Sequence, residues 1–232
     1  MPEHFYFLFF GFFLNNTSEA GLTRYIIENM HEGNTVIDIG ANCGFYTLLT
    51  SKLVGENGRV HAFEPTEQIF RLLQKSTRNL SNTTVNQKAL LDYSGTSHFY
   101  ADDSYSVANS IERSLDTQAK FEVETQTLDE YCVENNVVPD FIKIDAEGSE
   151  LKILQGSTRI LGQCEPIIAM ELLRDAEDQG QEAVELFLKM RYSAFRIEND
   201  GTLSLVSIET LRDESIFDGE GFVNLIFKKE LV

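Results

Sequence analysis

The chain has 232 residues, of which 42% are hydrophobic and 24% are charged, a profile typical of globular proteins that excludes disordered and collagen-like chains. Its 37 acidic and 19 basic residues give a formal net charge of −18. A surface this negative repels phosphate backbones and anionic membranes, so nucleic acid is excluded as the main partner. Three widely spaced cysteines without a Cys-x-x-Cys pair argue against a disulfide framework or a zinc ribbon. They favour a reducing compartment, so we expect a cytoplasmic protein.

The chain begins with a phenylalanine-rich apolar run from Phe5 to Leu14. The run is shorter than the roughly 20 residues of a membrane helix, and it lacks the basic residues and the cleavage site of a signal peptide. We therefore expect it to dock on the protein without membrane insertion. Alternatively, its rings wall an apolar pocket or form the contact of a homodimer. The expected organisation is an extension, residues 1–32, that packs on one domain, residues 33–232.

Strand and helix signals alternate along the chain. In order, the first half predicts a helix from Thr17 or Ser18 through Met30, a strand at 35–39, a helix through Leu53, a strand at 59–63, an amphipathic helix after Thr66 and a strand at 84–91. Residues 92–119 give no clear signal. The second half predicts a strand at 120–125, a helix opened by the capping box Thr127-Leu-Asp-Glu130, a strand at 141–145, a helix at 149–161, a strand at 166–170, a helix at 181–190, a hairpin around Asp200-Gly201 and a strand at 222–227.

This alternation predicts an α/β fold with a mainly parallel sheet and helices on both faces, to which the late hairpin adds an antiparallel edge. Ligands of such folds bind outside the carboxyl ends of the strands. The first strand ends in Asp38-Ile-Gly40-Ala-Asn42-Cys-Gly44, where two glycines allow a tight turn close to a ligand. The turn matches neither the dinucleotide G-x-G-x-x-G pattern nor a phosphate loop. With these two cofactor classes excluded, the expected ligand of the turn is a nucleoside-type cofactor without a pyrophosphate.

Acidic residues follow three further strands. Glu64 ends the second strand, where a carboxylate can accept hydrogen bonds from both ribose hydroxyls. Asp145 and Glu147 follow the strand at 141–145, and Glu171 follows the strand at 166–170. Three acids crowded in one cleft raise one another's pKa, which suits a general base. Two alternatives stay open: the acids hold a cation such as Mg²⁺, or Asp145 and Glu147 only cap the next helix, as we expect for Glu150.

Four segments together resemble the FkbM-type methyltransferases: Val36-Ile-Asp-Ile-Gly-Ala-Asn-Cys-Gly-Phe-Tyr46, Phe63-Glu64-Pro65, Thr127-Leu-Asp-Glu130 and Ile142-Lys-Ile-Asp-Ala-Glu-Gly-Ser-Glu150. The resemblance spans about residues 33–173, with a weaker echo in Phe222-Val-Asn-Leu225. It implies a Rossmann-like class I fold with a seven-stranded sheet that binds S-adenosylmethionine. The implied reaction is methyl transfer to a hydroxyl of a sugar, a polyketide or another natural product.

The resemblance also implies roles for individual residues. The methionine end of the donor is expected to meet Asp38, Gly40, Asn42 and Gly44 and to be covered by Tyr46, while Glu64 holds the ribose. Phe63 or Pro65 packs near the adenine, Ala89 lies at its edge, and Asp145 lies nearest to the sulfonium. For a hydroxyl acceptor the expected base is Glu147 or Asp145, with Glu171 in support. No metal is assigned. The family often has a histidine where this chain has Leu172, so this chain must use another base if that histidine is catalytic.

Other functions stay open as alternatives. A methyltransferase of the same fold could act on a nitrogen or a carboxylate, although the crowded acids would repel a carboxylate. A nicotinamide oxidoreductase would share the sheet and the ribose acid but lacks its glycine pattern here. A binding module with a decayed site conflicts with the intact Gly40, Gly44 and Glu64. The expected partner is a small-molecule or glycan acceptor.

Overall fold

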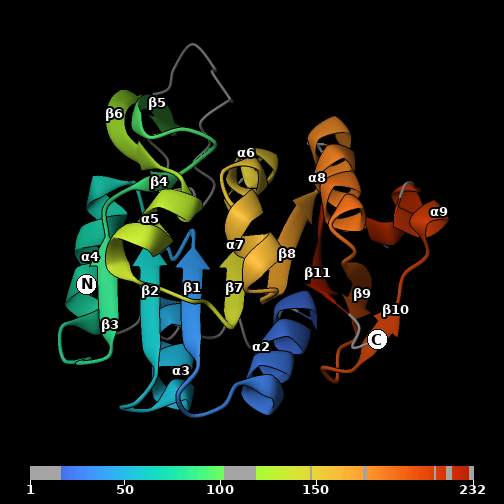
Figure 1. Cartoon of the computed structure of the whole chain (residues 1–232), viewed down its shortest axis with the longest axis horizontal. Helices are drawn as coiled ribbons and strands as arrows, with labels where there is room; N and C mark the ends of the chain where they lie inside the picture. Colours follow the sequence, from blue (N-terminus) through green and yellow to red (C-terminus); the bar gives the residue numbers. More distant parts are fainter. Residues whose placement is uncertain are drawn as a thin grey trace.

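The computed structural model describes residues 17–101, 119–146, 148–174, 177–211, 213–217 and 221–229. Its centre is an eight-stranded sheet in the order β10-β9-β11-β8-β7-β1-β2-β3 (Figure 1). The strands are β1 (Thr35–Ile39), β2 (Arg59–Phe63), β3 (Thr83–Asn86), β7 (Phe141–Ile144), β8 (Ile167–Leu173), β9 (Ser193–Ile197), β10 (Leu203–Leu205) and β11 (Phe222–Lys228). The run from β3 to β8 is parallel, whereas β11, β9 and β10 pair antiparallel.

The predicted α/β fold with a mainly parallel sheet is confirmed, and so is its antiparallel C-terminal edge. The sheet has eight strands instead of seven because the hairpin around Asp200-Gly201 adds β10 at the edge. The apolar strands β1 and β7 are buried on both faces. Ile37 and Ile142 join one half of the core and Val36 and Phe141 the other, as the two-residue period of a strand requires.

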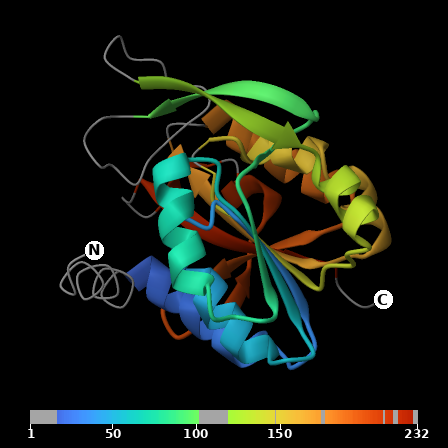
Figure 2. The same ribbon diagram turned by 90° about the vertical axis from the view of Figure 1, so that its left-hand side faces the viewer.

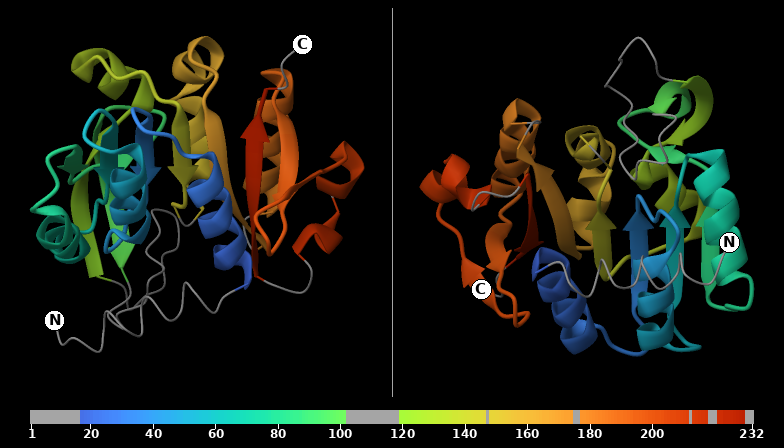
Figure 3. Two further views of the ribbon diagram at one scale, coloured as in Figure 1. Left: turned by 90° about the horizontal axis from the view of Figure 1, so that it is seen from below. Right: turned by 180° about the vertical axis from the view of Figure 1, so that it is seen from behind.

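Helices cover both faces of the sheet. On one face lie α2 (Thr17–Asn29), α3 (Phe45–Val54) and α4 (Glu67–Thr77), which Figure 3 shows from behind. On the other lie α5 (Leu128–Asn135), α6 (Glu150–Gln155), α7 (Thr158–Gln163) and α8 (Glu177–Lys189) (Figure 1). The short helices α9 (Ile208–Leu211) and η2 (Glu214–Phe217) follow β10. No helix in the described part of the chain is long and apolar enough to cross a membrane, and the run from Phe5 to Leu14 lies outside that part.

A second sheet lies across the end of the main sheet toward which β1 and β2 point (Figures 1 and 2). Its order is β4 (Ala89–Leu90), β6 (Ala119–Gln126) and β5 (Gly95–Ala101). The single strand predicted at 84–91 is therefore wrong, because the chain leaves the main sheet after Asn86 and enters the small one at Ala89. The side-chain amide of Asn86 donates to the carbonyl of Ala62 at 3.1 Å and holds this departure point on β2.

Two local predictions on the α5–α7 face also need correction. The helix predicted at 149–161 is interrupted at Gly156, where a Cβ would lie 2.0 Å from the carbonyl oxygen of Leu91. At the start of α5 the Thr127 hydroxyl accepts from the Glu130 amide at 3.1 Å, as predicted. The reciprocal half runs through Ser94: its hydroxyl donates to the Glu130 carboxylate, and its oxygen accepts from the Thr127 amide at 3.1 Å.

Candidate functional site

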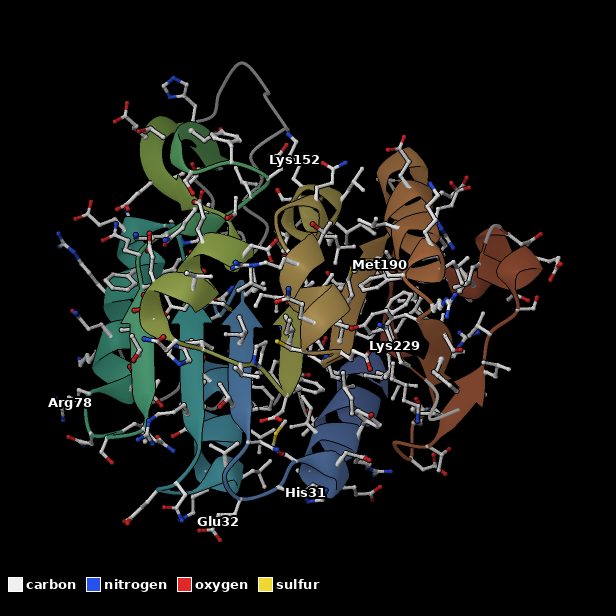
Figure 4. The ribbon with its side chains drawn as sticks, in the orientation of Figure 1. His31, Glu32, Arg78, Lys152, Met190 and Lys229 are labelled. Carbon is white, nitrogen blue, oxygen red and sulfur yellow. The ribbon has the colours of Figure 1, made fainter. Side chains whose placement is uncertain are left out.

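The turn after β1 brings three strand ends together. Gly40 has φ +72, and a Cβ on it would lie 1.7 Å from the carbonyl oxygen of Asp145, so only glycine fits here. The amides of Gly40 and Ala41 both donate to the carbonyl of Phe63, at 3.1 and 2.9 Å. The ends of β1, β2 and β7 are thus locked to one another. Figure 4 shows Lys152 of α6 toward the same end of the sheet, whereas His31 and Glu32 lie at the opposite end.

The rest of the turn uses left-handed backbone. Asn42 has φ 50, and its side-chain oxygen accepts from the amide of Cys43 at 2.7 Å. Gly44, with φ 97, opens α3. A Cβ on Gly44 would lie 2.8 Å from a methyl group of Leu73 on α4. The turn therefore packs closely against the next helix, and the predicted glycine positions are explained by backbone geometry and by space.

Glu64 lies directly beside this turn. One of its oxygens accepts from the Thr66 amide at 2.8 Å and the other from the Asn42 amide at 3.2 Å. The residue is 6% exposed, and burial raises the pKa of its carboxyl to about 7 against these hydrogen bonds. The Thr66 side chain also bonds this carboxyl group, so these contacts hold Glu64 in a fixed orientation beside the turn.

The three residues expected near an adenine differ in their surroundings. The Phe63 side chain is 1% exposed and packs edge-on against Tyr131, with ring centroids 4.7 Å apart. Its contribution to the turn is its carbonyl group, and Pro65 is the member of this pair with exposed surface. Ala89 is buried on β4, where the small sheet begins.

A buried lysine that the sequence reading did not single out organises the acids. Lys143 of β7 is paired in register with Asp38 of β1, so both side chains lie on the same face of the sheet. Its ammonium group is 3.0 Å from an oxygen of Asp145, 3.9 Å from one of Asp38 and 5.2 Å from the ring centroid of Tyr46. The other oxygen of Asp38 accepts from the hydroxyl of Thr47 at 2.6 Å.

Burial and charge act in opposite directions in this cluster. Burial alone would lower the pKa of Lys143, but the carboxylates of Asp145, Asp38 and Glu19 together raise it. Burial raises the pKa of Asp38, although Lys143 and Thr47 oppose this rise. These opposing effects favour the charged form of Lys143, which lies among the carboxyl groups of Asp145, Asp38 and Glu19.

The three predicted catalytic acids fare differently. Asp145, with its side chain 33% exposed, follows β7 as predicted. Glu171 was expected to follow a strand at 166–170, but it lies inside β8, which continues to Leu173. Ile144 pairs with Met170, so Asp145 and Glu171 lie side by side on adjacent strands. Glu147 lies outside the described residues.

Glu150 has a structural role, as expected, although it does not cap the helix. One of its oxygens accepts from the amides of Ala146 and Gly148, both at 3.1 Å, and so it holds the loop that leads from β7 into α6, whereas a cap would bond amides of the helix itself. In the described part of the chain, no group of three or more His, Cys, Asp or Glu side chains is arranged to hold a metal ion.

Three further polar residues reach the site without having been predicted: Thr47, Glu19 of α2 and Asn224 of β11. A signal existed for Lys143, since a lysine between two isoleucines in a buried strand needs a buried anionic partner. No local signal existed for Glu19, and the family echo in Phe222-Val-Asn-Leu225 gave Asn224 no role, because the partners of both residues are distant in the sequence.

Comparisons with known proteins agree with this geometry. A family model described as the methyltransferase FkbM domain matches residues 38–197. The hexuronic acid methyltransferase AglP of Haloferax volcanii is 30% identical over 146 residues, which cover 62% of this chain and 58% of that protein. This chain thus spans little more than half of that relative's length.

Solved structures show the same fold. The FkbM methyltransferase of Methylobacillus flagellatus gives a TM-score of 0.54 at 17% identity, covering 84% of this chain and 43% of that one. Aeropyrum pernix fibrillarin, solved with natively bound S-adenosyl-L-methionine, gives 0.53 at 11% identity, covering 90% and 72%. Together with the match over residues 38–197, the turn after β1 and the acids beside it show that the chain belongs to the FkbM methyltransferase family.

Proposed function

We propose that this protein is an S-adenosylmethionine-dependent methyltransferase that methylates a hydroxyl group of a sugar or a related natural product. The observation that carries the proposal is the glycine turn after β1 with Glu64 held beside it by the Asn42 amide. This pairing of a tight turn and a ribose-binding carboxylate suits an adenosyl ligand without a pyrophosphate. The similarity to a hexuronic acid methyltransferase favours a sugar as the acceptor.

The residues present fit a cationic methyl donor. One oxygen of Asp38 is buried without a hydrogen-bond partner in the described part of the chain, and Lys143 lies 3.9 Å from it. The carboxyl groups of Asp38, Asp145 and Glu64 lie at these strand ends, and Lys143 offsets part of their negative charge. When bound, the donor supplies a methyl group already activated on a sulfonium. Asp38 and Asp145 would face its positive charge, and Glu64 would hold its ribose hydroxyls.

The chain's own task is then to place the acceptor in line, at about 3–3.5 Å from the methyl carbon, and to take up a proton. Asp145, which follows β7, lies beside Glu171 of β8, and Glu147 is two residues beyond Asp145. We assign the base to Glu147 or Asp145, with Glu171 in support. A hydroxyl acceptor needs such a base, whereas a carboxylate acceptor needs none and would be repelled by these acids.

A transfer assay tests the proposal. The protein is incubated with methyl-labelled S-adenosylmethionine and glycosides of a hexuronic acid, beside the matching neutral hexosides. The expected product keeps its label in mild alkali, as a methyl ether does, whereas a methyl ester would lose it. If the label is lost in alkali, the product is a methyl ester and the acceptor is a carboxyl group instead of a hydroxyl group. Binding of NADH but not S-adenosylmethionine in calorimetry would refute the methyltransferase function.

A further inference from the structure

A hydrogen-bonded chain joins the two flanks of the protein to the donor site. Glu19 of α2 accepts from the phenol of Tyr46 with one carboxylate oxygen. Its other oxygen accepts from the side-chain amide of Asn224, on β11, at 3.2 Å. Glu19 and Asn224 both lie outside the residues matched by the family model, 38–197. Segments before and after the matched region therefore meet on one carboxylate.

The position of Glu19 is unusual for a helix that packs on a sheet. Residues Leu22, Tyr25 and Ile26 form the buried apolar stripe of α2, and Glu19 lies one turn before them, only 7% exposed. An apolar side chain would fill such a place without the cost of burying a charge. Burial raises the pKa of Glu19, while Tyr46 and Lys143 oppose this rise. A buried carboxylate with both oxygens bonded points to a role beyond packing.

The next link runs from Tyr46 to the acids. The Tyr46 ring lies under the Lys143 ammonium, at 5.2 Å from its centroid, a favourable cation–π contact. The same ammonium group holds Asp145 at 3.0 Å and faces Asp38. A rotation of the Tyr46 ring would therefore shift the Lys143 ammonium group and, with it, the position of the Asp145 carboxylate. Glu19 fixes the hydroxyl end of that ring.

We propose that Glu19 is a positioning residue of the methyl-donor site, acting through Tyr46 and Lys143 on Asp145. The inference rests on the proposed function, since it takes Tyr46 and Asp145 as donor contacts. It makes α2, which sequence reasoning places in an extension outside the catalytic domain, a necessary part of the site. Asn224 anchors the second oxygen of Glu19, so that the carboxylate cannot turn away from the phenol.

A double-mutant cycle tests this inference. The affinity for S-adenosylmethionine is measured by calorimetry for the wild type, Glu19→Gln, Tyr46→Phe and the double variant, together with the thermal midpoint of each protein. A hydrogen bond to a charged group that orients the site predicts about tenfold weaker binding in each single variant. The double variant should bind about as weakly as either single one, because both changes break the same link.

Tyr192→Phe is the matched control, because this buried phenol donates to the carbonyl of Leu161 at 3.0 Å, remote from the donor site. It should lower the thermal midpoint and leave donor affinity at the wild-type value. Wild-type affinity in Glu19→Gln and Tyr46→Phe would overturn the inference, and so would independent losses that multiply to about a hundredfold. If Glu19→Gln does not fold, the donor affinity of Tyr46→Phe, which lacks only the hydroxyl group, is compared with that of the same control. A wild-type protein that does not bind the donor would instead refute the proposed function.

Discussion

Replacing Lys143 by methionine removes the cation from the buried cluster while keeping most of the side chain's apolar length. The change leaves Asp38, which is 1% exposed, with the Thr47 hydroxyl as a hydrogen-bond donor, and removes the ammonium group that lies 3.0 Å from Asp145. Removing one partner of a buried ion pair costs about 3–5 kcal/mol. Because Asp145 is one third exposed and can turn to water, we expect the lower limit, about 3 kcal/mol. For a chain of this length that corresponds to a thermal midpoint lower by about 6–12 °C.

Urea unfolding of Lys143→Met beside Lys75→Met measures this loss. Lys75 is exposed on α4, so its replacement should change stability by less than about 0.5 kcal/mol. The deficit of Lys143→Met should be larger at about pH 8 than at about pH 5. The reason is that the loss of the cation raises the folded-state pKa of Asp38 further, and a raised carboxyl pKa favours folding only at low pH. A deficit below about 1 kcal/mol, or one without this pH trend, would show that Lys143 does not neutralise the acids.

Three further outcomes follow from the site. Gly40→Ala should destabilise the protein by at least about 3 kcal/mol, because its Cβ would lie 1.7 Å from the Asp145 carbonyl oxygen. The control Gly33→Ala, with φ +91 and nothing within 4 Å of its Cβ, should cost about 1 kcal/mol. Equal losses of the two variants in urea unfolding would contradict the contact. With a Glu64 pKa of about 7, donor affinity should rise about tenfold between about pH 6 and about pH 8, and Glu64→Gln should abolish this rise in calorimetry. In the donor-free protein the sign is opposite: the raised pKa stabilises the fold at low pH, and that contribution is lost as the pH rises through about 7. Glu147→Gln should leave donor affinity unchanged and lower turnover by about 10²-fold or more, and near-normal turnover would remove Glu147 from the role of base.

Local patterns were sufficient for most of the fold. The mainly apolar runs at 35–39 and 141–145 predict β1 and β7, because strands buried on both faces are mainly apolar; Asp38 and Lys143 are the buried exceptions, and they face each other. The glycines of the first turn predict its backbone, because Gly40 and Gly44 both have left-handed φ angles. The position of Glu64 follows from the end of β2. In each case the physical cause lies within a few residues of the feature.

The features of the fold and the site that were not predicted depend on contacts between residues that are distant in the sequence. The break between α6 and α7 arises where the backbone of Leu91 passes Gly156. The strand predicted at 84–91 divides because Ala89 pairs with β6, more than thirty residues later in the chain. Glu19 and Asn224 are separated by 205 residues, so their hydrogen bond exists only in the folded protein. The site was therefore predictable where one strand end supplies it, and unpredictable where distant helices and strands complete it.

The contacts of the Ser94 hydroxyl group join the two ends of the β5–β6 strand pair. Its single hydroxyl fastens the chain just before β5 to the residues just after β6, since it bonds both Thr127 and Glu130. The start of β5 and the end of β6 thus lie beside one hydroxyl group, and Gly95 pairs with Thr125 at that point. A change at Ser94 would therefore loosen both strands together, while the turn after β1 and its acids lie elsewhere in the fold.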